Sequence, residues 1–158
     1  MTEKYPRGVC CHEAGHAVVA WSFKLPVVAV YVACSEAKGW YGGANVPAGS
    51  DAHLHFMDQV VILAAGKTGE KVLACPAHEP AWLDDLWKMH ERLNANGISQ
   101  EKERWSRITE ACERARLILE THRDKALKLV DQLVECGRVE RPEFLRLMNG
   151  ETSQSPNS

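Results

Sequence analysis

The most reactive arrangement in the sequence is the run His12-Glu13-Ala14-Gly15-His16, an instance of His-Glu-x-x-His. On an α-helix, side chains four residues apart lie on the same face, so His12 and His16 can bind one metal ion. Glu13 lies beside His12 and can reach a water molecule on that metal. Two imidazoles and a carboxylate base are the groups that a zinc hydrolase uses. The motif therefore predicts a Zn²⁺ site with His12 and His16 as ligands and Glu13 as the general base.

The alternative interpretation of the motif is a pair of structural histidines that only hydrogen-bond their neighbours. The positions from Ala14 to Trp21 are mostly apolar, which predicts that this helix is buried. Two histidines and a glutamate are costly inside a protein unless something binds them. We therefore favour the metal site.

A catalytic zinc ion held by two histidines needs a third protein ligand, and its fourth position stays open to water. Later polar residues supply the candidates: Asp85, His78, Glu79, Asp84 and His90. A helix predicted over 80–93 places its apolar residues on one face: Leu83, Leu86, Trp87, His90 and Leu93. Relative to that face, Asp84 turns to solvent and Asp85 lies on the shoulder. The facing argument favours Asp85, while His78 and Glu79 stay open because they lie in a loop between two prolines.

The sequence patterns around these residues predict an α+β, mainly α-helical fold that positions them. The motif helix should end near Lys24, and 26–33 and 39–46 are typical of two strands in a small glycine-containing sheet. Further helices are expected from Asp51 to about Cys75 and in a C-terminal helical bundle. This bundle is predicted to contain helical residues 99–137, interrupted by a turn near 121–123, and a last short helix over 142–148. We expect one domain over 1–148 and a disordered polar tail over 149–158.

The second predicted strand is rich in glycine, and glycine in a strand often marks a close approach of another backbone. One hypothesis is that an extended peptide substrate adds to this strand at five residues: Trp40, Tyr41, Gly42, Gly43 and Ala44. The alternative is a plain hairpin that covers the core. Sequence alone does not separate the two.

Composition excludes several other functions. The formal net charge is −2 and the basic residues are scattered, so no nucleic-acid partner is expected. The longest apolar run, 25–35, is too short to span a bilayer, which predicts no membrane insertion. Six cysteines form no Cys-x-x-Cys pair and no signal sequence precedes the motif, which favours reduced thiols and a cytoplasmic location. Gly66-Lys67-Thr68 lacks the rest of a phosphate-binding loop, so no nucleotide is expected.

Six segments, the motif among them, resemble in order and spacing the peptidase domain of the FtsH family of zinc proteases. They are 12–17, 39–42, 63–70, 84–86, 115–123 and 129–133. The resemblance implies that His12, His16 and Asp85 hold zinc and that Glu13 is the general base. It also implies a small sheet whose edge receives substrate, and proteolysis of unfolded or flexible polypeptides.

The sequence departs from that family in ways that affect its expected partners. No ATPase module precedes the motif, which predicts a stand-alone, ATP-independent peptidase domain that receives polypeptides directly or from a separate unfoldase or adaptor. The family's Gly-Gly-Arg-Ala-Ala-Glu is Ala-Gly-Lys-Thr-Gly-Glu at 65–70, which leaves a homo-oligomer open. Two other functions stay open: a catalytically silent zinc-binding structural or regulatory module, and a zinc amidohydrolase acting on a small molecule.

Overall fold

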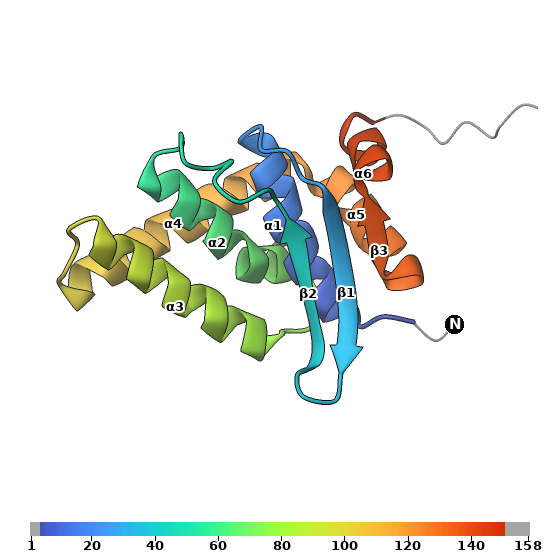
Figure 1. Cartoon of the computed structure of the whole chain (residues 1–158), viewed down its shortest axis with the longest axis horizontal. Helices are drawn as coiled ribbons and strands as arrows, with labels where there is room; N and C mark the ends of the chain where they lie inside the picture. The colour runs from blue at the N-terminus through green and yellow to red at the C-terminus, as the bar shows by residue number, and fades with distance from the viewer. Residues whose placement is uncertain (1–3, 151–158) are drawn as a thin grey trace, which may run out of the picture.

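The computed structural model describes residues 4–150 of the 158-residue chain and confirms an α+β, mainly helical fold (Figure 1). Within this range the elements are, in order, α1 (Arg7–Ser22), β1 (Ala29–Ser35), β2 (Gly39–Asn45), α2 (Phe56–Val72), α3 (Glu79–Ala95), α4 (Glu101–Thr121), α5 (Arg123–Cys136), β3 (Arg138–Glu140) and α6 (Arg141–Met148). No helix of the described part is long and apolar enough to cross a membrane.

The motif helix α1 lies at the centre of the molecule (Figure 1), and 12 of its 16 residues are buried. It packs against α2 so closely that glycine is required on both sides of the contact. A Cβ atom at Gly15 would lie 2.2 Å from the carbonyl oxygen of Ala65, and one at Gly69 would lie 2.8 Å from that of Cys11. The two helices therefore touch through backbone atoms, which fixes their relative position.

The sheet has the order β2-β1-β3 and all of its pairs are antiparallel. Val30 in the central strand pairs with Ala44 on one side and Val139 on the other. The third strand follows Gly137, whose φ of 74° ends α5 in the left-handed region. Sequence patterns did not predict β3, because three residues are too few to show a strand periodicity. This order leaves β2 at an edge of the sheet.

The helical part agrees with the predicted boundaries at most positions. His122 separates α4 from α5, which confirms the turn expected near 121–123. The second helix begins at Phe56, later than expected, after turns between Pro47 and Leu54. The expected disordered tail begins at 149, and most of it, 151–158, lies outside the described residues.

The buried face predicted for α3 is correct at Leu93 but wrong at Leu83 and Trp87. Leu93 is buried together with Asp85 and Met89, whereas Leu83 and Trp87 are 61% and 63% exposed. The inward face is thus centred on Asp85 and Met89, beside the predicted one. The apolar pattern misled because two large hydrophobic side chains of this helix lie on the surface.

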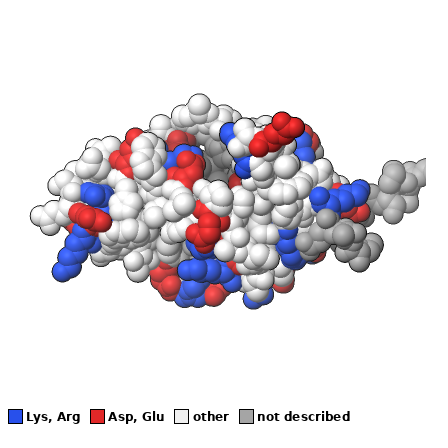
Figure 2. Space-filling model, turned by 90° about the horizontal axis from the view of Figure 1, so that it is seen from below, with Lys and Arg blue, Asp and Glu red and all other residues white. Residues whose placement is uncertain are grey.

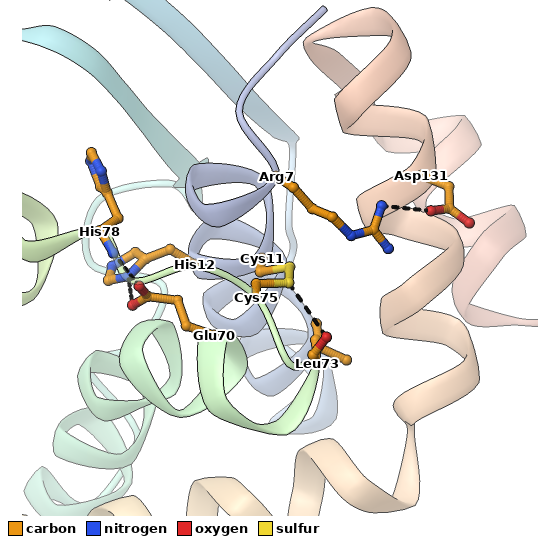
Figure 3. The surroundings of a disulfide bond; sticks show 8 residues. All are labelled: Arg7, Cys11, His12, Glu70, Leu73, Cys75, His78 and Asp131. Carbon is orange, nitrogen blue, oxygen red and sulfur yellow. Dashed lines mark hydrogen bonds and ion pairs between the residues drawn. A yellow bond between two sulfur atoms is a disulfide. The ribbon is translucent and has the colours of Figure 1, made fainter. Parts of the chain in front are cut away.

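A disulfide joins Cys11 in α1 to Cys75, three residues after the end of α2, with Cα atoms 6.5 Å apart (Figure 3). The expectation of reduced thiols is therefore wrong for this pair. The two cysteines are 64 positions apart and meet only because α1 packs on α2, so their spacing carries no signal. Cys10 is buried, as predicted for a small apolar residue.

Candidate metal centre

The two motif histidines are each oriented by a hydrogen bond at Nδ1. His16 Nδ1 donates to the backbone carbonyl of Ile62 at 2.8 Å, and His12 Nδ1 donates to a carboxylate oxygen of Glu70 at 2.9 Å. Acceptors at both Nδ1 atoms place the protons of the neutral rings there. Each Nε2 atom then presents a lone pair, the form in which histidine binds a metal.

Asp85 brings a third ligand atom to these lone pairs. Its Oδ2 lies 2.7 Å from Nε2 of His12 and 2.9 Å from Nε2 of His16, and the two Nε2 atoms are 3.1 Å apart. With neutral rings, all three atoms are acceptors, so they repel one another unless a cation lies between them. The three residues predicted as ligands are therefore brought together, and they could hold a metal ion.

The donor set fits zinc in type and size. Two imidazole nitrogens and one carboxylate oxygen are the ligand types of a catalytic zinc site. Bonds of about 2.0–2.2 Å in a tetrahedral site separate the ligand atoms by about 3.3 Å. The separations of 2.7–3.1 Å in the protein reach that value with shifts of a few tenths of an ångström.

Without a metal, the local charges favour a proton between the histidine Nε2 atoms and Asp85, where the metal ion would lie. Burial alone would lower the pKa of His12, but hydrogen bonds to Asp85 and Glu70 outweigh it and raise the pKa to about 9. Asp85 raises the pKa of His16 against a similar burial effect. The two histidines hold the pKa of Asp85 well below its usual range, although burial opposes this. The group thus stabilises positive charge at its centre.

Glu13 points into the same region but is not a member of the ligand group. Its side chain is buried, and burial raises its pKa, while charges on His16 and His12 oppose the shift. Glycine at position 42 of β2 makes room for it, since a Cβ atom there would lie 2.6 Å from Cγ of Glu13. A carboxylate of raised pKa beside a metal site is suited to accept a proton.

A second glycine keeps space for the ligands themselves. A Cβ atom at Gly66, in α2, would lie 2.4 Å from Nε2 of His12 and 2.5 Å from Nε2 of His16. No side chain fits there without displacing both ligand atoms. Gly66, which the sequence places in an incomplete phosphate-loop pattern, is thus part of the candidate metal centre.

The centre opens into a cavity of about 710 Å³. One wall is formed by all five residues predicted to bind substrate: Trp40, Tyr41, Gly42, Gly43 and Ala44. The opposite wall comes from His78 and the first turns of α3. Figure 2, which views the lower end of the molecule, shows a hollow with charged side chains at its rim, and Lys38 and Lys88 are among the residues that line the cavity.

The other ligand candidates do not join the group. Asp84 is exposed and pairs with Lys88 at 2.8 Å, and Glu79 pairs with Lys67 at 3.3 Å. His90 accepts a hydrogen bond from Arg104 outside the cavity.

His78 lines the cavity but offers no ligand atom to the group. Burial, followed by the charge of His12, lowers its pKa. His53 and His55 are exposed, as predicted for surface histidines, and His55 caps α2.

Glu70 is the site residue that the sequence analysis missed. It is 2% exposed, and its second carboxylate oxygen accepts a hydrogen bond from the backbone N–H of His78 (Figure 3). The available signal was its place one turn after Gly66, on the same face of the predicted helix. A carboxylate on the buried face of a helix needs a partner.

Fold and site together define a mainly helical protein with a two-histidine, one-carboxylate centre beside a sheet edge. Comparison of the chain with models of known protein families gives no match, and comparison with curated proteins gives none either.

Proposed function

We propose that this protein is a zinc-dependent metalloendopeptidase, similar to the peptidase domain of the FtsH family, that cleaves unfolded or flexible polypeptides. The observation that carries the proposal is the position of Glu13. It shares one cavity with His12, His16 and Asp85, beside an edge strand.

His12, His16 and Asp85 would hold the zinc ion. When bound, zinc supplies a Lewis acid that lowers the pKa of a coordinated water to about 7 and polarises a carbonyl group. Glu13 accepts a proton from the attacking water. At the same time the water oxygen bonds to the scissile carbon, and the π electrons of the carbonyl group move to the carbonyl oxygen. Glu13 then gives the proton to the leaving nitrogen as the C–N bond breaks, so it acts first as base and then as acid.

The edge strand β2 supports a polypeptide substrate. Within residues 4–150 only β1 pairs with β2, so alternate residues of β2 direct backbone N–H and C=O groups away from the sheet. These groups can pair with an extended segment, which would run past Glu13 because Gly42 contacts that side chain. An open edge favours an extended polypeptide over a small amide.

The test combines metal content with turnover. We expect about one zinc ion per chain and cleavage of casein by the wild-type protein. Glu13→Gln should retain zinc and lose at least about 100-fold in rate, the size of a general-base effect. Asp85→Ala should lower zinc affinity and activity together.

Three results would oppose the proposal. Cleavage by Glu13→Gln at the wild-type rate would exclude the general-base mechanism. Bound zinc without cleavage of casein or peptides would support the silent zinc-binding module. Hydrolysis of small amides alone would support the amidohydrolase.

A further inference from the structure

The wall of the cavity that faces β2 carries an imidazole with no partner of its own. His78 lies just before α3, and among the described residues none forms a hydrogen bond with its ring. The ring centroid lies 6.4 Å from that of His12, with the planes at 75°. A free N–H donor therefore lies next to a metal ligand, inside the cavity.

The backbone of His78 is held by the carboxylate that holds His12. Oε2 of Glu70 accepts from Nδ1 of His12 at 2.9 Å, and Oε1 accepts from the backbone N–H of His78. Figure 3 shows the His78 side chain pointing away from Glu70, on the opposite side of its own backbone. One buried group thus fixes the His12 ring and the backbone of His78 relative to each other, so the His78 ring starts from a fixed backbone position beside the site.

The other polar side chains of the cavity are less well placed to donate to a substrate. Successive strand residues face opposite sides of a sheet. Gly42 faces Glu13, so Gly43 and the Tyr31 ring that it contacts point to the other face of the sheet, although Tyr31 also borders the cavity. Trp40 is on the Glu13 face, but it is 37% exposed and its ring packs edge-on against Tyr5. On the wall opposite β2, Lys88 is the rival donor among the described residues, but Asp84 binds its ammonium group at 2.8 Å.

We propose that His78 is a catalytic residue whose ring N–H donates a hydrogen bond to the scissile carbonyl oxygen as negative charge develops there. This inference rests on the proposed peptidase function. No proton leaves His78 in the step. Glu13 takes the water proton, the new C–O bond forms, and the carbonyl electron pair moves to the oxygen that His78 stabilises.

The experiment compares His78→Ala with His53→Ala, a matched change at an exposed histidine. Zinc content, kcat and KM are measured with a fluorogenic peptide. For His78→Ala we expect a kcat about 100-fold lower, KM within twofold and zinc content unchanged, because one oxyanion donor contributes about 10²–10³ in rate. His53→Ala should match the wild-type protein.

A second measurement does not depend on turnover. A phosphinic peptide, in which a tetrahedral phosphinate replaces the scissile amide, is titrated into each zinc-loaded protein by calorimetry. His78→Ala should bind it about 100-fold more weakly. In the Glu13→Gln background, the same His78 change should leave substrate affinity within twofold. His78→Asn, which keeps an N–H donor, should recover part of both losses.

Several results would overturn the inference while leaving the peptidase function intact. They are a His78→Ala kcat within threefold of wild type, unchanged phosphinate affinity, or a loss that appears in KM or zinc content. A large kcat loss in Lys88→Met with none in His78→Ala would assign the role to Lys88. If the wild-type protein neither cleaves peptides nor binds the phosphinate, the proposed function and this inference both fail.

Discussion

Replacing Gly66 with alanine should disable the metal centre without touching a ligand. The added methyl carbon would lie 2.4–2.5 Å from Nε2 of both His12 and His16. Atoms in contact need about 3.5 Å, so each ring must move by about 1 Å. Metal–ligand bonds tolerate about 0.2 Å, and loss of a single supporting hydrogen bond already costs 10–100-fold. We therefore expect zinc affinity to fall by at least about 100-fold.

The same substitution should leave the fold in place. Alanine is better than glycine in a helix by about 1 kcal/mol, which offsets part of the 1–3 kcal/mol expected from disturbed buried hydrogen bonds. Urea unfolding of the metal-free protein should thus shift by less than about 2 kcal/mol. Zinc affinity is measured by competition with a chromogenic chelator, with Lys71→Ala, an exposed change on the same helix, as control. Affinity within threefold of wild type would refute the reasoning.

Three further changes test the surroundings of the centre. Glu70→Gln should weaken zinc binding 10–100-fold in the chelator assay, because the amide cannot accept both of the hydrogen bonds that Glu70 now receives. The metal-free protein should lose up to about 3 kcal/mol of unfolding free energy between pH 6.5 and 9, since the raised pKa of His12 stabilises only while the ring is protonated. Asp85→Asn should flatten that pH dependence in urea titrations. Cys75→Ser should lower the unfolding free energy by about 2–4 kcal/mol, because the Cys11 bridge spans 64 positions.

The Glu70 and Cys75 tests each have a matched control in an exposed residue. Glu113→Gln removes a surface carboxylate and should leave zinc affinity unchanged, and Cys34→Ser should leave stability unchanged. Equal effects of Glu70→Gln and Glu113→Gln would contradict the assignment of Glu70. Unfolding free energy that rises between pH 6.5 and 9 would contradict the sign given for His12.

Much of the centre could be predicted from the sequence because its ligands obey local rules. His12 and His16 share a helix face by their spacing, and Asp85 was preferred to Asp84 by its angle round a helix. The position of Asp85 around the helix correctly predicted that it faces inward, although the centre of the buried face was misplaced. Asp85 lies closer than Asp84 to both the predicted and the observed buried face. Glu70 was not predicted as a site residue, because its role depends on how α2 packs on α1. The periodicity of a single helix does not describe that packing.

The parts of the fold that sequence reasoning missed depend on contacts between distant segments. The short strand β3 exists because α5 ends at Gly137 and returns the chain to β1. The Cys11–Cys75 bridge depends on the same kind of long-range packing. On α3, Leu83 and Trp87 are large apolar residues that the fold leaves on the surface, so hydrophobicity alone gave the wrong face.

The sparse burial of α3 has a consequence for the order in which the centre assembles. This helix buries only Asp85, Met89 and Leu93 among its seventeen residues, whereas α1 and α2 are locked together through their backbones. We therefore expect His12, His16 and Glu70 to be in place before α3 brings Asp85 to them. A metal ion bound to His12, His16 and Asp85 would link α3 to α1. Metal binding would then hold this wall of the cavity in place.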